Sequence, residues 1–336
     1  MAQRVLTGIK PTGTPHVGNL LGAIRPALRL AQDSANDALY FIADYHALIT
    51  IHDKKQLSHL TLDVAATWLA MGLDPAKVTF YRQTDVPEIT ELTWILTCFT
   101  SKGWMNKAHA YKALLDKNRE AGVEDLDSGI GMGVYSYPVL MAADILAFDI
   151  DWVPVGKDQV QHIEIARDIA QRLNHTVGAE VLRLPQAKLE ENSAIVPGVD
   201  GRKMSKSYDN TIALFGTSKE LKKTVNRIVT DSLPPEAPKD PETSIIFQIF
   251  RAIATPEECE ALAGRFRTGI GYGDAKGALF ERLEAVLAPT RERYAYLMAH
   301  PEEVDAMLLE GAARARATAK KVLDRVRQSL GIRASI

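Results

Sequence analysis

The sequence predicts an α/β fold with a parallel sheet, followed by an all-helical C-terminal domain. Up to about residue 215, short apolar runs alternate with segments of helical periodicity, which is typical of a parallel sheet and its crossover helices. Beyond residue 215 the pattern is helical except for a proline-rich loop at 231–241. A chain of 336 residues is long enough for two domains, which we place at 1–215 and 216–336. A helical segment at about 100–185 is inserted in the first domain.

The composition excludes several classes of protein. Hydrophobic residues make up 46% and charged residues 24%, as in ordinary globular proteins, and the net charge of −2 gives no overall attraction to nucleic acid. No apolar run approaches the ~18 residues of a membrane span and no secretory segment precedes Gly8, so we expect a cytoplasmic protein without a membrane partner. Cys98 and Cys259 are the only cysteines, which excludes a disulfide framework, an iron–sulfur cluster and a structural zinc site of four cysteines. We expect both thiols to be mostly buried.

The first strand and the turn after it have the features of an anion site. Residues 4–9 read as a short buried strand, residues 10–15 break it, and a helix runs from residue 20 to about 31. Glycines in such a turn bring backbone N–H groups to a helix N-terminus, where anions are favoured. Glycines alone would fit the first turn of any α/β protein, but His16 and Asn19 on either side of Gly18 favour a functional turn.

The next elements place polar residues at the carboxyl edge of the sheet. We expect strands at 39–44 and 78–81 and helices at 57–71 and 91–99. Because ligands of open α/β sheets bind at the C-terminal ends of strands, Asp44 and His46 are placed near a pocket. A lone histidine is more often structural, so this pattern leaves the role of His46 open.

The segment 135–148 is apolar except for Asp144. We expect a helix with Pro138 in its first turn, in which Tyr137, Met141 and Asp144 share one face. A carboxylate buried in such a helix must be paired or hydrogen-bonded. Its partner is either an arginine across the helix or a polar group of a ligand.

A second strand–turn–helix follows at 153–165. The strand ends at Gly156, where the backbone permits close approach, and the helix begins near Asp158. Asp158 is placed to bind ribose hydroxyls or to cap the helix, and both can hold. Gln159 can bind the ammonium or the carboxylate of an amino acid.

Residues 201–207, Gly-Arg-Lys-Met-Ser-Lys-Ser, combine two lysines with two hydroxyls. Lys203 and Lys206 are compact point charges that suit phosphate oxygens, and Ser205 and Ser207 add donors. A solvated basic loop is the ordinary interpretation of such a cluster. Residues 211–215 are expected to close the catalytic fold after this loop.

The C-terminal part should be helical and basic at its end. We expect helices at 218–229, 244–254, 256–267, 273–296 and 301–330. The last of these helices carries Arg314, Arg316, Lys320, Lys321, Arg325 and Arg327. These cations either form a solvated face or contact phosphates of a nucleic acid.

Two of these stretches resemble the signatures of one enzyme family. Residues 203–207, Lys-Met-Ser-Lys-Ser, match the second signature of class I aminoacyl-tRNA synthetases without substitution, and His-Val-Gly-Asn at 16–19 resembles the first, His-Ile-Gly-His. With Pro-Thr-Gly before the first signature and Leu-Gly-Ala after it, the chain is similar to the tryptophanyl-tRNA synthetases over nearly its whole length. It departs from them at Lys10, where many members carry glutamine, and at Leu6, where many carry an aromatic residue.

The resemblance implies a Rossmann-like catalytic domain, a C-terminal domain that binds the tRNA anticodon, and a homodimer bridged by tRNA(Trp). It implies catalysis by positioning and electrostatic stabilisation, with His16, Asn19, Lys203 and Lys206 as the catalytic residues. The residues expected to bind ATP are Lys10, Pro11, Thr12, Gly18, Asn19, Gly156, Lys157, Asp158, Ile195, Val196, Lys203, Met204, Ser205, Lys206 and Ser207. The residues expected to bind tryptophan are Gly8, His46, Tyr137, Met141, Asp144 and Gln159. Mg²⁺ is expected on the phosphates of ATP, without a metal site of the protein itself.

Asp144 favours tryptophan as the amino acid. Indole offers one N–H donor, so a carboxylate at the end of an apolar slot recognises it, whereas a phenol needs other polar contacts. The predicted function is therefore that of an ATP-dependent tryptophan–tRNA ligase. The alternatives are a tyrosine–tRNA ligase of the same fold, a non-catalytic paralogue that binds tryptophan or RNA, and a small-molecule nucleotidyltransferase.

Overall fold

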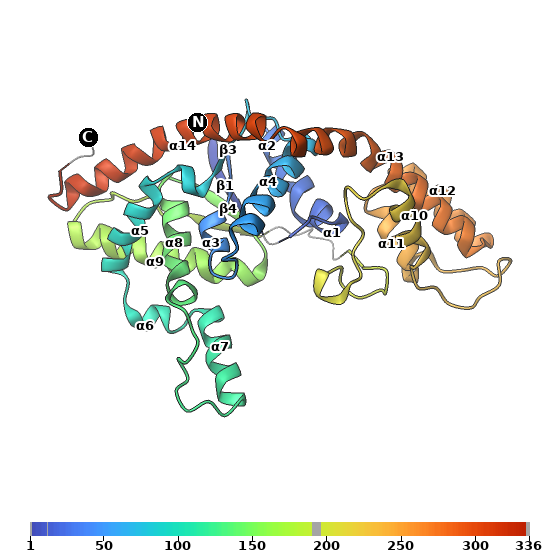
Figure 1. The fold of residues 1–336 in the computed structure, drawn as a ribbon, viewed down its shortest axis with the longest axis horizontal. Helices are drawn as coiled ribbons and strands as arrows, with labels where there is room; N and C mark the ends of the chain where they lie inside the picture. The colour runs from blue at the N-terminus through green and yellow to red at the C-terminus, as the bar shows by residue number, and fades with distance from the viewer. Residues whose placement is uncertain (1, 12, 190–195, 334–336) are drawn as a thin grey trace.

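A five-stranded parallel sheet forms the centre of the molecule in the computed structural model, which describes residues 2–11, 13–189 and 196–333 (Figure 1). The strands are β1 (Gln3–Ile9), β2 (Asn36–Ile42), β3 (Thr79–Arg82), β4 (Trp152–Val155) and β5 (Gln186–Leu189). Their order is β3-β2-β1-β4-β5, which confirms the predicted Rossmann-like α/β fold. The order reverses at β1, and ligands of open α/β sheets bind at the carboxyl ends of strands beside such a switch point.

Both faces of the sheet are covered by helices. In β2, Ala38, Tyr40 and Ile42 belong to one hydrophobic core, whereas Leu39 and Phe41 belong to the other. Because side chains alternate along a strand, this division buries the strand on both sides, which is why its sequence is a continuous apolar run. The helices of this part are α1 (Val17–Asn19), α2 (Arg25–Gln32), α3 (Asp44–Ala47), α4 (Lys54–Ala70), α5 (Glu88–Phe99), α6 (Lys102–Met105), α7 (His109–Glu120), α8 (Met132–Leu146) and α9 (Val160–Val177).

Two strands differ from the prediction. Strand β2 ends at Ile42 rather than at residue 44, and Asp44 already begins α3. The sequence pattern does not predict β5, because all four of its residues, Gln186–Leu189, are exposed. An edge strand with no buried face lacks the apolar periodicity by which strands are identified.

The helix that carries Asp144 begins earlier than predicted. Helix α8 starts at Met132, so Pro138 lies inside the helix and not in its first turn. Gly131, in an extended conformation, precedes the first turn instead. Pro138 has no N–H to donate to the carbonyl of Val134, a loss that the buried packing of the helix tolerates.

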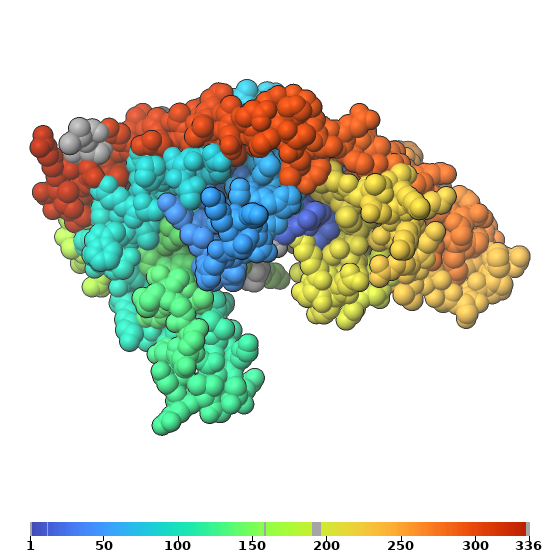
Figure 2. Space-filling view, viewed as in Figure 1, coloured from blue at the N-terminus to red at the C-terminus, as the bar shows by residue number. Residues whose placement is uncertain are grey.

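Helices α6 and α7 project from the body of the molecule, as the green surface below the rest in Figure 2 shows. They lie within the segment 100–185 that we expect to be inserted. Helix α8, strand β4 and helix α9 of the same segment instead pack in the α/β body, where α8 and α9 contribute to a core with β2 and β3.

The C-terminal part is helical, as predicted. Its helices are α10 (Ser218–Asn226), α11 (Ile245–Arg251), α12 (Pro256–Thr268), α13 (Tyr272–Ala299) and α14 (Pro301–Ser329). Helices α10 to α13 share one hydrophobic core with α2 and α4, and α14 runs back over the sheet (Figure 1). At Gly311 of α14, an added Cβ would lie 1.8 Å from the carbonyl oxygen of Phe80 in β3, so only glycine allows this close contact. The division at residue 215 stays a prediction.

The arginines of α14 do not form the free basic face that we considered. Arg316 is paired with Glu88 and Arg327 with Glu91, both in α5, and Arg325 is paired with Asp149. The guanidinium of Arg314 donates to the backbone carbonyls of Pro75 and Val78. These four side chains therefore attach α14 to the catalytic part and are not available to tRNA phosphates.

The two cysteines lie in different surroundings. Cys98 of α5 is exposed and Cys259 of α12 is partly exposed, so the expectation that both thiols are mostly buried is wrong. No helix among the described ranges is long and apolar enough to cross a membrane.

Candidate active site

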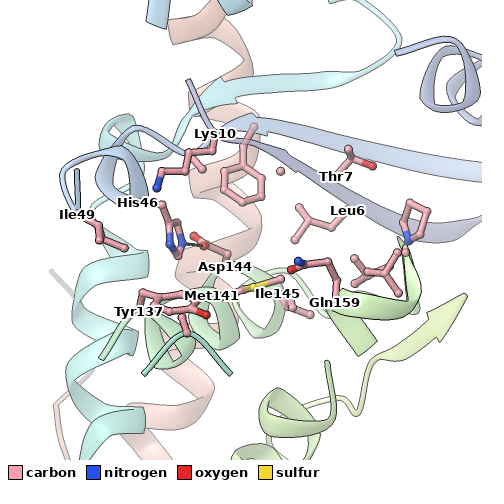
Figure 3. Close-up of a pocket in the computed structure, with 18 of the residues that line it drawn as sticks. Leu6, Thr7, Lys10, His46, Ile49, Tyr137, Met141, Asp144, Ile145 and Gln159 are labelled. Atoms are coloured by element: carbon pink, nitrogen blue, oxygen red, sulfur yellow. Dashed lines mark hydrogen bonds and ion pairs between the residues drawn. The ribbon is translucent and has the colours of Figure 1, made fainter. Parts of the chain in front are cut away.

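A cavity of about 520 Å³ opens at the carboxyl ends of β1 and β4, beside the switch point of the sheet (Figure 3). Its wall is mostly apolar and includes Leu6, Phe41, Met141, Ile145 and Val155. Its polar side chains are those of Thr7, Lys10, His46, Tyr137, Asp144 and Gln159. An apolar cavity of this size with a few converging polar groups is typical of a site for a small organic ligand.

Asp144 is the most deeply buried polar group of the cavity, with 1% of its surface exposed. Its Oδ2 lies 2.8 Å from Nε2 of His46, and its Oδ1 accepts a hydrogen bond of 2.6 Å from Nε2 of Gln83. Burial raises the pKa of Asp144, and the hydrogen bonds with His46 and Gln83 oppose the rise. The arginine partner that we considered is therefore excluded. Each carboxylate oxygen keeps a further lone pair for a ligand donor.

His46 and Gln83 come from the ends of neighbouring strands. His46 lies in α3 after β2, and its ring meets that of Tyr137 edge to face at 6.2 Å between centroids. Gln83 directly follows β3 and is fully buried. The sequence analysis missed Gln83, although the rule that led to Asp44 and His46, a polar side chain just past a strand, also applies to it.

The remaining residues expected to bind tryptophan also line the cavity. These are Gly8, Tyr137, Met141 and Gln159. A Cβ at Gly8 would lie 2.6 Å from the ring of Phe41, so glycine allows this ring to form the wall of the cavity beside β1. Phe41 thus supplies an aromatic wall in a chain that has leucine at position 6. The Tyr137 hydroxyl is 3.3 Å from Nε2 of His162, in α9.

Lys10 also lines the cavity, on the side of His46 (Figure 3). Burial lowers the pKa of its ammonium group, and Lys10 has no hydrogen bond or ion pair with any residue that the structure describes. An unpaired cation in a mostly apolar cavity is costly unless a ligand supplies an anionic group. Lys10 therefore adds a requirement for negative charge to this end of the cavity.

The first turn lies beside this cavity. His16 is 8% exposed, its backbone N–H donates to Oδ1 of Asn19 over 3.0 Å, and its ring Nδ1 has no hydrogen-bond partner within the described ranges. Burial, and to a lesser extent the charge of Lys206, lower the pKa of His16 to about 4. The ring is therefore neutral near pH 7 and offers one N–H donor to a ligand.

The lysine loop, residues 201–207, contacts the first turn. The backbone N–H of Gly18 donates to Sδ of Met204 over 3.2 Å, and Met204 is buried. The ammonium of Lys206 lies 2.8 Å from the place that a Cβ on Gly13 would occupy, so glycine makes room for it. The two signature stretches, almost 190 residues apart (|i−j| of 186 between Gly18 and Met204), thus lie together. Gly201, with a φ of 83°, begins the loop in a conformation that favours glycine.

Asn210 holds the lysine loop in this conformation. It is 1% exposed; its Oδ1 accepts from the N–H of Ser205, and its Nδ2 donates to Oδ1 of Asp200 and to the carbonyl of Lys203. A Cβ at Gly198 would lie 2.3 Å from the Asn210 side chain. The sequence analysis assigned no role to Asn210, because its partners cannot be identified from local sequence alone.

Comparison with known proteins agrees with this geometry. The family model for tRNA synthetases class I (W and Y) matches residues 2–288. The chain belongs to this family. A tryptophan–tRNA ligase of Pseudomonas putida is 54% identical over 335 residues, which are 99% of this chain and 74% of the relative. A tryptophan–tRNA ligase of Xylella fastidiosa is 54% identical over 334 residues, 99% of this chain and 77% of the relative.

A solved structure of the same family has a similar fold. The tryptophanyl-tRNA synthetase of Campylobacter jejuni, complexed with ADP and tryptophan, superimposes with a TM-score of 0.89 and is 42% identical, covering 98% of this chain and 100% of the other. The five-stranded sheet and the C-terminal helices therefore represent a class I synthetase over almost the whole chain.

Not every residue that we expected at a class I nucleotide site is brought to the cavity. Thr12 and Ile195 lie outside the described residues, as does the side chain of Asp158. Gly156 lines the cavity, whereas Lys157 is exposed. Val196 is buried, and its carbonyl accepts from the N–H of Met204, which joins it to the lysine loop. Pro11, Ser205 and Ser207 lie at the first turn and the loop without a ligand-specific contact. The described residues contain no group of three or more His, Cys, Asp or Glu that could hold a metal.

Proposed function

We propose that this protein is a tryptophan–tRNA ligase. It activates tryptophan with ATP and transfers the amino acid to tRNA(Trp). The observation that carries the specificity is the buried carboxylate of Asp144 at the end of a mostly apolar cavity, where it accepts the single N–H of an indole. Both relatives at 54% identity are named as tryptophan–tRNA ligases, which supports the same substrate.

The first step is adenylation of tryptophan. A carboxylate oxygen of tryptophan attacks the α-phosphorus of MgATP, the bond from the α-phosphorus to the bridging oxygen breaks, and pyrophosphate leaves with the electron pair. Lys10 lies in the cavity with no partner in the described structure, and it attracts the carboxylate of the substrate. Gln159 and Tyr137 bind the ammonium group.

Catalysis consists of positioning and electrostatic stabilisation of the leaving pyrophosphate, with no protein nucleophile. Lys206 and Lys203 follow the pyrophosphate as charge develops on it. His16, as a neutral ring, and Asn19 donate to phosphate oxygens, and Gly18 lets adenine approach the backbone. Mg²⁺ arrives with ATP, held mainly by phosphate oxygens and water.

The second step transfers tryptophan to tRNA. A hydroxyl of the terminal ribose attacks the carbonyl carbon of the adenylate, and AMP leaves with the mixed-anhydride oxygen. Helices α10 to α13 are the part that we assign to the anticodon arm, because the arginines of α14 are already paired with the catalytic part. The protein acts in the cytoplasm, where tRNA is charged.

The active form is a homodimer. Leu48 is exposed and lines a groove with Thr90, Thr93 and Gly133, between α3, α5 and α8. Trp94 is 70% exposed and Met132 72%, and both are sequence neighbours of groove residues. Large exposed apolar side chains around one groove are typical of an interface.

Exchange of labelled pyrophosphate into ATP, measured with tryptophan and with tyrosine separately, tests the function. Exchange with tryptophan alone is expected. Exchange with tyrosine alone would show that the specificity is that of the tyrosine ligase, and no exchange with either amino acid would favour a non-catalytic paralogue.

A further inference from the structure

Asp63 is a buried carboxylate that the mechanism above does not use. It lies in α4 and is 1% exposed. Its Oδ1 accepts a hydrogen bond of 2.6 Å from the hydroxyl of Tyr294, in α13, whereas its Oδ2 has no hydrogen-bond partner within residues 2–11, 13–189 and 196–333. A buried carboxylate oxygen without a donor is unfavourable, so a compensating interaction with charge is required.

Tyr294 connects this carboxylate to the segment after the lysine loop. Its ring stacks on that of Phe215 with 3.8 Å between centroids and 4° between planes. The residues just before Phe215 hold the first turn, since Ala213 pairs with His16 and the carbonyl of Ile212 accepts from the N–H of Val17 over 2.8 Å. Asp63 and Tyr294 are therefore built into the framework that carries both signature stretches.

The charged group near this framework is the ammonium of Lys206. It lies over Gly13 of the first turn and has no hydrogen bond or ion pair with any described residue. Burial lowers the pKa of Lys206, and the negative charge of Asp63 opposes that lowering. The other titratable group that faces Lys206 is His16, whose ring the Lys206 charge keeps neutral. Asp63 thus acts on Lys206 through space, without a direct contact.

We propose that Asp63, held by Tyr294, is a positioning residue for Lys206. Its carboxylate draws the ammonium toward the first turn while the nucleotide site is empty, and it competes with the phosphates of ATP for the same charge. The inference rests on the proposed role of Lys206 in binding ATP. It adds that the ground-state affinity for ATP is weakened by a buried carboxylate in α4, so that Lys206 is kept for the pyrophosphate as it forms.

A double-mutant cycle on ATP binding tests this inference. The wild type, Asp63→Asn, Lys206→Met and the double variant are titrated with MgATP by calorimetry, without tryptophan. Asparagine keeps an oxygen for the Tyr294 hydroxyl and removes only the charge. Asp63→Asn should tighten ATP binding about three- to tenfold, and in the Lys206→Met background the gain should fall to about twofold or less.

Two tyrosine variants separate this role from a merely structural one. Tyr294→Phe keeps the stack on Phe215 but leaves Lys206 as the only partner of the carboxylate, so ATP should bind more weakly, by about twofold or more. Tyr40→Phe is the matched control, since the Tyr40 hydroxyl also forms a buried hydrogen bond, of 2.5 Å to the carbonyl of Ala27, in the same core. It should lower the melting temperature without a change in ATP affinity.

Several results would overturn the inference. Equal tightening by Asp63→Asn with and without Lys206 would mean that the charge acts on the nucleotide directly. Weaker binding in Asp63→Asn, with unchanged circular dichroism, would give the carboxylate the opposite role. If Lys206→Met alone leaves ATP affinity unchanged, Lys206 does not compete for phosphate and the inference fails, whereas pyrophosphate exchange by the wild type still tests the proposed function separately.

Discussion

Replacing Asp144 with alanine should remove recognition of tryptophan while leaving recognition of ATP. Asp144 is 1% exposed, so water cannot take the place of its carboxylate at the end of the cavity. A hydrogen bond to a charged group contributes about 1.5–3 kcal/mol, which corresponds to a loss of about 10- to 150-fold in tryptophan affinity. The KM for ATP should stay within about twofold, because the first turn and the lysine loop are unchanged.

The same substitution also costs stability, which must be measured beside the kinetics. It leaves the donors of His46 and Gln83 without their acceptor, at about 1–3 kcal/mol for each buried unpaired group. Asp44→Ala is the matched control: Asp44 is a buried carboxylate that accepts from Thr84 over 2.6 Å, and it does not line the cavity. Pyrophosphate exchange at varied tryptophan and varied ATP, with a thermal melt of each variant, gives both quantities.

Equal loss of tryptophan and ATP affinity in Asp144→Ala would refute this reasoning, as would an unchanged KM for tryptophan. A selective loss of tryptophan affinity in Asp44→Ala would show that general loosening of the strand ends, and not the indole contact, governs the substrate.

Three further predictions concern packing, protonation and assembly. Gly311→Ala should destabilise the protein by about 1–3 kcal/mol or more, since its Cβ would lie 1.8 Å from the Phe80 carbonyl oxygen; Gly277→Ala on α13, with open space at the Cβ, should be neutral or stabilising in the same denaturant titration. The ring of His16 should titrate near a pKa of about 4 in NMR spectra of the free protein, and that pKa should rise when ATP binds, because phosphate stabilises the protonated ring; a free-protein value near that of an exposed histidine would contradict the burial argument. Because the native pKa of His16 is lowered, the unfolded state binds more protons as pH falls from about 6.5 toward 4, so stability should fall over that range and fall less in His16→Asn. Trp94→Glu should convert a sedimenting dimer to monomer; an unchanged sedimentation coefficient would exclude the groove beside α5 as the interface.

The elements that could be predicted are those whose periodicity is local. Strand β2 and helix α8 are continuous apolar segments, and the sequence identifies both, although α8 begins before Pro138. Strand β5 has no apolar face, so only its pairing with β4 reveals it.

The partners of the site residues could not be predicted, because they depend on contacts between distant segments. His46 and Gln83 are separated from Asp144 by 98 and 61 positions, and nothing local marks them as its partners. Arg327 reads as part of a basic face, yet it pairs with Glu91 across 236 positions. Motifs identified the two signature stretches; the structure adds that Met204 and Lys206 lie against the first turn.

Charging of tRNA(Trp) in a competition between tryptophan and tyrosine at equal concentration is the most direct test of the central claim. It requires the cavity, both signature stretches and the helices assigned to tRNA to act together. We predict that tRNA(Trp) acquires tryptophan and no detectable tyrosine, and that Asp144→Ala abolishes charging at low tryptophan. Charging with tyrosine, or pyrophosphate exchange with tryptophan but no charged tRNA(Trp), would contradict the account.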